Sequence, residues 1–296
     1  MREFYPSKIL LAGEYSVLLG SRALALPFFE KRSSWSQSKQ LDEPILLRYL
    51  KQYAENPIWS ELIDQKQMDT DLKAGWTLET NIPLGYGLGS SGALCAAIID
   101  KYSRQRSWTQ EKLRSQLQQM ESLFHRTSSG IDPLISFLQK PLIMDGDRIS
   151  ELDSSYLTHL NNYPIHLVDS KKPRQTSEFV QKFRDKITDG KYESRIKNEL
   201  IPLNNRMISH FVSNQTKEFR KSWVQISELS LELFAEMIPP DIELFWRRGL
   251  ENGRFALKLC GAGGGGYFLM LGESDRKELN VLRPNFWNGK SSEETI

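Results

Sequence analysis

Hydrophobic and polar positions alternate along some segments of the chain and recur at helical spacing along others. Trp76, Leu78 and Ile82 fall on one face of an extended segment, so we predict a strand over 76–82. The segment 93–102 that follows has the composition of a helix. Further strands are predicted over 8–19, interrupted at Gly13, and over 22–27, 165–169, 255–259 and 267–271. Strands are therefore expected near both ends of the chain.

Helical periodicity is clearest over 109–124. One apolar stripe there is formed by Leu113, Leu117, Met120 and Phe124. Glu121 lies along the buried edge of this stripe, where a carboxylate needs a partner, either a basic side chain or a metal ion. Other helices are predicted over 43–53, within 177–238, and over 242–250, ending near Gly253.

The stretch between the strand at 76–82 and its following helix is rich in glycine. Gly85, Gly87 and Gly89 stand at alternate positions, and Ser90 and Ser91 follow. Glycine lets the backbone approach an anion closely, and the serines could cap the helix and present N–H groups. A helix N-terminus attracts phosphate through its N–H groups and partial positive charge. The plainer interpretation is a turn without a ligand. The stretch is not a Walker P-loop, because no lysine follows a second glycine.

Composition narrows the class of protein. The 296 residues suffice for two domains, and 39% hydrophobic with 26% charged residues is the balance of a globular protein. The formal net charge of +2 gives no case for binding nucleic acid or a membrane. Two cysteines, Cys95 and Cys260, argue against a disulfide framework or zinc site and for a reducing compartment. Without a signal peptide or a long apolar run, we expect a cytoplasmic protein with no membrane span.

Two charged residues have plain local explanations. Asp132 precedes Pro133, which is typical of an N-cap followed by proline at the first helical position. Lys8 begins a predicted strand, where a lysine is usually a solvated end. On local grounds, neither residue needs a catalytic role.

Three motifs nevertheless resemble those of the GHMP kinases, which include galactokinases and homoserine, mevalonate and phosphomevalonate kinases. Residues 87–93, Gly-Leu-Gly-Ser-Ser-Gly-Ala, resemble the central motif. Lys8 with the Gly-Glu-Tyr and Val-Leu after it is similar to the first motif. Residues 258–266, Lys-Leu-Cys-Gly-Ala-Gly-Gly-Gly-Gly, are similar to the third. The motifs occur in family order, so the resemblance spans nearly the whole chain.

A further block resembles one branch of the family. Glu121, eleven residues before Asp132, together with His125 and the Ser-Gly at 129–130, is similar to the corresponding block of mevalonate kinases. His125 is given no chemical role. Tyr15 departs from that branch, which usually has histidine there, whereas phosphomevalonate kinases more often have tyrosine. Cys260 stands where mevalonate kinases usually have threonine.

The resemblance implies an α+β fold with two domains. The N-terminal one, placed at residues 1–160, would be a ribosomal S5 domain 2-like domain that binds ATP. The C-terminal one, placed at residues 161–296, would be ferredoxin-like. The family places its site in the cleft between them.

The resemblance also implies roles for individual residues. Asp132 would deprotonate the substrate hydroxyl, and Lys8 would keep Asp132 ionised and stabilise charge on the transferred group. Magnesium would be held by Ser91 and Glu121. The phosphates of ATP would be cradled by Gly85, Gly87, Leu88, Gly89, Ser90 and Ser91. Substrate contacts are expected from Glu14, Tyr15, Arg174, Cys260, Gly261 and Ala262, although Arg174 is equally explained as a solvated loop charge.

The implied function is ATP-dependent phosphorylation of mevalonate to 5-phosphomevalonate, a step toward isoprenoid precursors. A phosphomevalonate kinase is the alternative that Tyr15 and Gly92 favour and the block from Glu121 to Asp132 opposes. A catalytically silent, ligand-binding relative is the alternative from another class, although a retained base with its lysine argues against it. The expected partner is a mevalonate-like alcohol, with no nucleic acid or membrane, and the expected assembly is a homodimer.

Overall fold

The computed structural model describes residues 1–37, 56–105, 107–124, 128–160, 163–173, 176–274 and 280–282. The chain divides into two compact units, each assembled from several segments. The first comprises Met1–Lys8, Pro27–Pro83 and Leu88–Gln139, and the second comprises Ile9–Leu26, Leu84–Gly87 and Lys140–Ile296. The helices and strands of both units confirm the predicted α+β class. The boundary at residue 160 stays a prediction, and the helix predicted over 43–53 lies outside the described residues.

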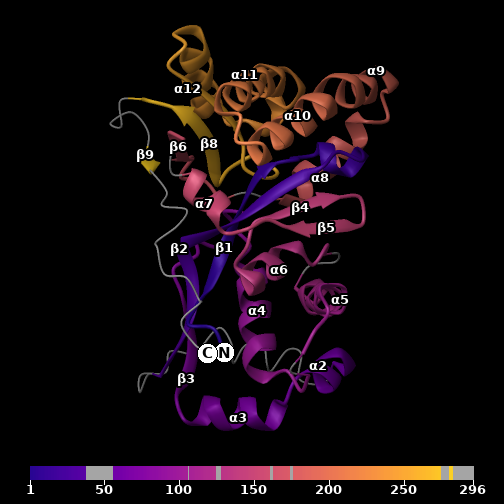
Figure 1. The fold of residues 1–296 in the computed structure, drawn as a ribbon, viewed down its shortest axis with the longest axis vertical. Helices are drawn as coiled ribbons and strands as arrows, with labels where there is room; N and C mark the ends of the chain where they lie inside the picture. The colour runs from indigo at the N-terminus through magenta and orange to yellow at the C-terminus, as the bar shows by residue number, and fades with distance from the viewer. Residues whose placement is uncertain are drawn as a thin grey trace. The chain divides into compact units, whose positions relative to one another are not determined.

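Helix α4 occupies the centre of a helical cluster in the first unit. Its neighbours are α5 and α6, and Figure 1 shows the three side by side. Their bounds are Ser90–Tyr102 for α4, Gln110–Ser122 for α5 and Ile131–Leu138 for α6. Gly92 of α4 faces α6 so closely that a Cβ atom there would lie 2.7 Å from the backbone nitrogen of Pro133. The close approach of these two helices therefore requires glycine at position 92.

Periodicity identified α5 and one strand of the first unit, but not the two short helices before that strand. The predicted stripe on α5 is buried at Leu113, Leu117 and Met120. The strand predicted over 76–82 is β3 (Trp76–Thr80), which confirms its first five residues. Two short helices precede it, α2 (Pro57–Leu62) and α3 (Gln65–Lys73).

The larger sheet has the strand order β1-β2-β4-β5, with β3 also paired to β2. The bounds are Tyr5–Ala12 for β1, Ala23–Gln37 for β2, Leu142–Asp145 for β4 and Arg148–Glu151 for β5. β2 is much longer than the predicted strand at 22–27. Its beginning pairs antiparallel with β4, Leu24 opposite Ile143, and its end pairs antiparallel with β3, Trp35 opposite Leu78.

The prediction that the first strand resumes after Gly13 is wrong. β1 ends at Ala12, and Ser16–Leu19 form the 3-10 helix η1. The backbone leaves the extended conformation at Gly13, with φ 107°, and at Tyr15, with φ 57°. Val17 and Leu18, which suggested that the buried strand continues, are 40% and 49% exposed.

The second unit contains an antiparallel sheet in the order β7-β8-β6-β9. The bounds are Phe255–Leu259 for β7, Tyr267–Gly272 for β8, Ile165–Asp169 for β6 and Asn280–Leu282 for β9. The strands predicted over 165–169, 255–259 and 267–271 are thus confirmed. Helices α11 (Thr216–Leu233) and α12 (Pro240–Glu251) pack against β7. Every residue of β7 is buried, including Lys258.

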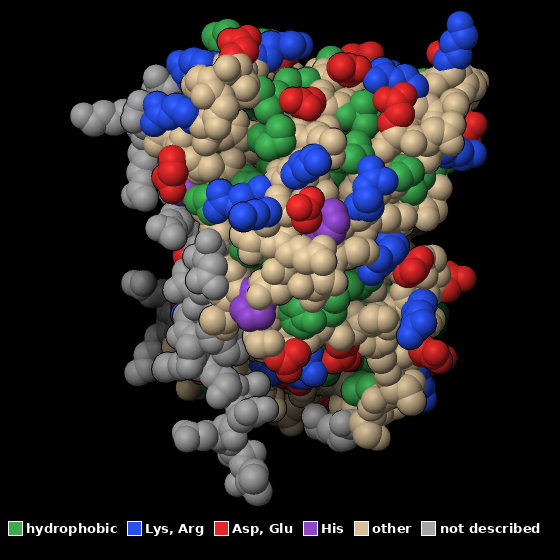
Figure 2. All heavy atoms as spheres, turned by 45° about the horizontal axis from the view of Figure 1, so that its top comes forward, with side chains coloured by type: hydrophobic (Ala, Val, Ile, Leu, Met, Phe, Trp, Pro, Cys, Tyr) green, Lys and Arg blue, Asp and Glu red, His purple; other side chains and the backbone are tan. Residues whose placement is uncertain are grey.

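Helices make up most of the rest of the second unit, which confirms the helical prediction within 177–238. They are α7 (Ser155–Leu160), α8 (Thr176–Lys186), α9 (Gly190–Arg195), the π-helix η2 (Ile196–Leu200), α10 (Ile201–Val212) and η3 (Ala235–Met237). None of the helices in the described part of the chain has the length and apolar character that crossing a membrane requires. Lys and Arg side chains alternate with Asp and Glu side chains on the face that Figure 2 shows.

Candidate active site

Lys8 and Asp132 form an ion pair within the first unit. The Nζ atom of Lys8 lies 3.1 Å from Oδ1 of Asp132. The Lys8 side chain is 12% exposed and that of Asp132 is 30% exposed, so the pair remains open to solvent on the side of the carboxylate. The backbone N–H of Lys8 donates to the carbonyl of Leu88 at 2.9 Å, which ties β1 to the end of the glycine-rich stretch.

The local interpretation of Asp132 as an N-cap does not hold. Helix α6 begins at Ile131, and its N-cap is Gly130, which has a φ of 71°. Asp132 therefore belongs to the first turn of the helix, where a negative charge interacts favourably with the helix dipole. Its side chain is directed to Lys8 and makes no capping hydrogen bond.

Glu121 is buried in the last turn of α5 with two hydroxyl groups as partners. Its side chain is predicted to need a basic partner or a metal ion, but the hydroxyl of Ser91 donates to Oε1 at 3.1 Å. The hydroxyl of Ser128 donates to Oε2. Sequence reasoning missed Ser128. A buried carboxylate followed within seven residues by serine was the signal, because such a carboxylate requires donors.

The electrostatic surroundings favour the neutral form of Glu121. Its pKa is raised to about 7, chiefly by burial and secondly by the negative charge of Asp132. The hydroxyls of Ser128 and Ser91 and the charge of Lys8 act in the opposite direction. Two carboxyl groups in different environments thus lie close together, and a cation beside Glu121 would favour its ionised form.

The N-terminus of α4 lies against this pair of acidic residues. Gly89 is the N-cap of the helix, with φ 73°, and a Cβ atom there would lie 3.1 Å from both Oδ2 of Asp132 and Cγ of Lys8. The sequence suggested that Ser90 or Ser91 caps the helix, but neither does, and no side chain caps this end. Since Ser91 bonds to Glu121 instead, the first turn of α4 joins both carboxylates in one cluster.

The glycine-rich segments of the second unit pack against one another. Gly85 and Gly87 have φ values of 74° and 70°. A Cβ atom on Gly266 would lie 2.7 Å from the carbonyl oxygen of Tyr86, and the N–H of Gly266 donates to the carbonyl of Lys172 at 2.7 Å. The loop at 260–266 is therefore held closely by backbone contacts, for which glycine is needed.

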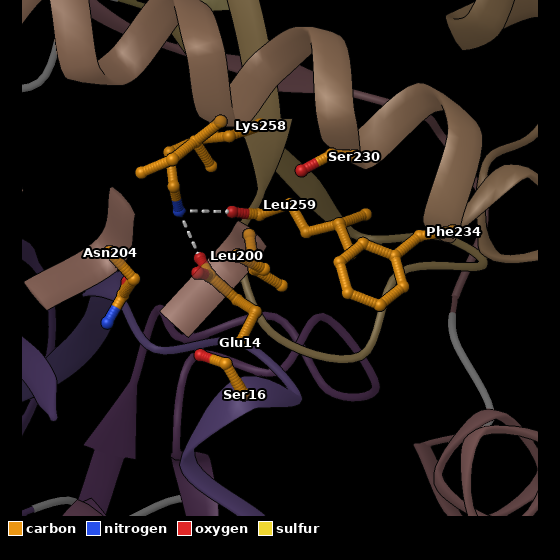
Figure 3. A pocket seen from close by; sticks show the side chains of 9 residues that line it. Glu14, Ser16, Leu200, Asn204, Ser230, Phe234, Lys258 and Leu259 are labelled. Atoms are coloured by element: carbon orange, nitrogen blue, oxygen red, sulfur yellow. Dashed lines mark hydrogen bonds and ion pairs between the residues drawn. The ribbon is translucent and has the colours of Figure 1, made fainter. Parts of the chain in front are cut away.

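The predicted substrate residues of the second unit lie mostly in the interior. Glu14 accepts a hydrogen bond from the buried Lys258, as Figure 3 shows. The hydroxyl of Tyr15 donates to the carbonyl of Ala262 at 2.5 Å. Cys260 is buried and forms no disulfide, and Gly261 next to it has a φ of 104°. Arg174, the remaining predicted contact, and His125 lie outside the described residues.

Comparison with known proteins gives one domain match and a shared fold. Residues 49–140 match the family model described as the GHMP kinases N terminal domain. The fold is similar to that of the mevalonate kinase of Methanococcus jannaschii, with a TM-score of 0.64 and 18% identity over 91% of this chain and 90% of that one. No curated protein matches the sequence itself.

Two other kinases share the fold. For the phosphomevalonate kinase of Streptococcus pneumoniae, solved with phosphomevalonate and AMPPNP, the TM-score is 0.59 at 14% identity over 92% of each chain. For the galactokinase of Lactococcus lactis, complexed with galactose, it is 0.59 at 16% identity over 92% of this chain and 85% of that one. Identities this low show the fold and leave the acceptor open. Residues 49–140 thus match the N-terminal domain of the GHMP kinases, and the fold of nearly the whole chain is similar to that of these solved kinases.

Proposed function

We propose that the protein transfers the γ-phosphoryl group of ATP to the hydroxyl of a small alcohol. Mevalonate is the first candidate acceptor, and 5-phosphomevalonate would be the product. The observation that carries the proposal is the contact between Lys8 and Asp132 beside the N-terminus of α4. Phosphoryl transfer depends on positioning and charge neutralisation, and a carboxylate, an ammonium group and a helix N-terminus in one cluster supply both.

Asp132 is the proposed base. As the hydroxyl oxygen of the acceptor attacks the γ-phosphorus, its proton passes to the Asp132 carboxylate and the bond from that phosphorus to the oxygen of ADP breaks. The partial exposure of Asp132 suits this role, since a base must reach its substrate. Lys8 balances the charge of Asp132 and stabilises negative charge on the transferred group.

The stretch from 85 to 91 is the proposed phosphate site. Its three glycines take positive φ, and no side chain caps the helix that it leads into. Uncapped N–H groups at the positive end of a helix are suited to hold phosphate. A kinase of similar fold was solved with AMPPNP, an analogue of ATP, which supports ATP as the phosphoryl donor.

Ser91 and Glu121 are the residues that would hold magnesium. A hydroxyl and a carboxylate oxygen 3.1 Å apart are hard oxygen donors of the kind that this ion prefers. Within the described ranges, no three His, Cys, Asp or Glu side chains gather as a metal cage. Magnesium bound with ATP needs no such cage, because phosphates and water supply its other ligands. When bound, it would neutralise charge on the phosphates.

The identity of the acceptor is the most specific part of the proposal. Mevalonate rests on the block from Glu121 to Asp132, which resembles that of mevalonate kinases, and on the similarity of fold to such an enzyme. Phosphomevalonate is the second candidate, because Tyr15 favours it in sequence and an enzyme of that specificity shares the fold. The ion pair between Lys8 and Asp132 speaks against a silent sensor, since ligand binding alone needs no base.

The test is a coupled ADP-release assay with ATP and magnesium, in which mevalonate, phosphomevalonate and galactose are offered separately. We expect turnover on mevalonate, slowed at least about 10²-fold in Asp132→Asn. Turnover on phosphomevalonate alone would support the second candidate. If no small alcohol is phosphorylated by protein that binds ATP normally, the kinase proposal is wrong and the sensor takes its place.

A further inference from the structure

Tyr15 adopts a backbone conformation that bulky residues rarely take. Its φ is 57° and its ψ is −43°, in a turn that begins at Gly13 with a φ of 107°. Side chains with a Cβ atom are strained at positive φ, so such a residue persists only where its surroundings hold it. The contacts of the Tyr15 side chain must therefore hold this strained conformation in place.

The ring of Tyr15 is buried in an aromatic cluster of the second unit. Its centroid lies 4.7 Å from that of Phe183 and 5.1 Å from that of Phe234. The hydroxyl reaches beyond the cluster and donates to the carbonyl of Ala262 at 2.5 Å. Tyr15 thus connects the turn after β1 to the glycine-rich loop at 260–266.

A buried ion pair ties the same turn to β7. Nζ of Lys258 donates to the carboxylate of Glu14 and, at 2.9 Å, to the carbonyl of Leu259 (Figure 3). Lys258 is 1% exposed and Glu14 is 8% exposed. The small cavity that they line with Ser16, Asn204 and Ser230 has room for about one water molecule, far less than a substrate needs. The charges of Glu14 and Lys258 therefore neutralise each other.

The second half of the loop is fixed by other contacts. The N–H of Gly264 donates to the carbonyl of Met237 at 2.6 Å, and that of Gly266 donates to the carbonyl of Lys172. Ala262, in the first half, receives its hydrogen bond from Tyr15. The hydroxyl of Tyr15 is thus placed to set the conformation of residues 260–262.

We propose that Tyr15 is a positioning residue, which holds residues 260–262 in the shape that binds the acceptor, while Lys258 and Glu14 hold the turn that carries Tyr15. This rests on the proposed kinase function and on the expectation, drawn from the resemblance, that Cys260, Gly261 and Ala262 contact the acceptor. It also revises the sequence-based expectation for two residues: Glu14 and Tyr15 act on the acceptor through the loop and do not bind it themselves.

The test compares Tyr15→Phe with Tyr192→Phe. Tyr192 is a matched control, because its ring lies 6.2 Å from that of Phe183 and its hydroxyl donates to a backbone carbonyl, that of Leu233, at 2.9 Å. Each variant loses one such hydrogen bond, so we expect similar losses of stability on urea unfolding. Only Tyr15→Phe should raise the KM for the acceptor, by about fivefold, with kcat changed less than about twofold. Only Tyr15→Phe should speed amide hydrogen exchange in a peptide covering 260–266.

Each outcome decides the role of Tyr15. Exchange in 260–266 that is unchanged by Tyr15→Phe would overturn the proposal, and so would an equal rise in KM for both variants. Faster exchange with an unchanged acceptor KM would show that the loop is held without any consequence for binding, which also overturns it. If the wild-type protein phosphorylates no alcohol, the kinase function fails separately, and hydrogen exchange alone then decides whether Tyr15 holds the loop.

Discussion

Lys8 and Asp132 face each other at 3.1 Å, although one comes from the first strand and the other from the first turn of α6. The sequence suggested a strand end for Lys8 and an N-cap for Asp132, but Lys8 lies inside β1 and Asp132 lies in the first turn of α6. Their contact beside Gly89 has no local explanation, because the two residues are far apart in the sequence. This long-range relationship is what makes a catalytic role the better interpretation of both.

The first prediction concerns Asp132. Asp132→Asn keeps the size of the side chain and removes its ability to accept a proton, so kcat should fall by at least about 10² while ATP binding, measured by calorimetry, changes little. Asp145→Asn is the control, since Asp145 is 64% exposed and lies 3.9 Å from its cationic partner. Near-normal turnover by Asp132→Asn would remove Asp132 from the mechanism.

The second prediction concerns the proposed magnesium ligand. Glu121→Gln removes a carboxylate oxygen, so the magnesium concentration for half-maximal activity should rise at least about tenfold, the low end of the effect of weakening a ligand. Glu111→Gln on the same helix is the control, because Glu111 is exposed at the other end of α5. Equal magnesium dependence in the two variants would place the metal elsewhere.

The third prediction is a pH dependence of the metal-free protein. The pKa of Glu121 is raised to about 7 from an ordinary value of 4.5. Between these two pH values, the carboxyl group keeps its proton in the folded state and loses it in the unfolded state. Stability from this group is therefore fully present below about pH 4.5 and is lost as pH rises through about 7. The free energy of unfolding in urea, measured with a chelator, should fall between pH 5 and 7.5 more steeply for the wild type than for Glu121→Gln. Parallel curves would contradict the assigned burial of Glu121.

Elements with strong periodicity were predictable from the sequence. The stripe on α5 and the strands β3, β6, β7 and β8 were found because their apolar residues repeat at the period of a helix or a strand. Prediction failed after Gly13, where apolar Val17 and Leu18 mimic a strand but remain exposed in η1. Hydrophobicity alone does not tell a buried strand from a turn whose backbone takes positive φ.

The candidate site was predictable in its residues and much less in its contacts. The motifs predicted four site residues, Lys8, Ser91, Glu121 and Asp132. The structure places all four in one cluster of the first unit. The partner of Glu14 was not foreseen. A lone lysine within the apolar strand at 255–259 was a usable signal, because a buried charge requires an opposite one. Nothing local identifies which acid supplies it.

The last prediction tests whether the packing of α4 on α6 positions Asp132. A Cβ atom at position 92 would lie 2.8 Å from the backbone carbonyl carbon of Asp132, so Gly92→Ala should force the helices apart and cost about 1–3 kcal/mol of stability. Gly190→Ala is the control. It also replaces a helical glycine, but its Cβ atom would meet nothing within 4 Å, so the helix propensity of alanine should leave stability equal or slightly higher. Because the shift moves Asp132 relative to Lys8, kcat should fall in Gly92→Ala well below the loss explained by unfolded protein. A destabilised variant whose folded fraction keeps full kcat would show that this helix contact serves the fold alone.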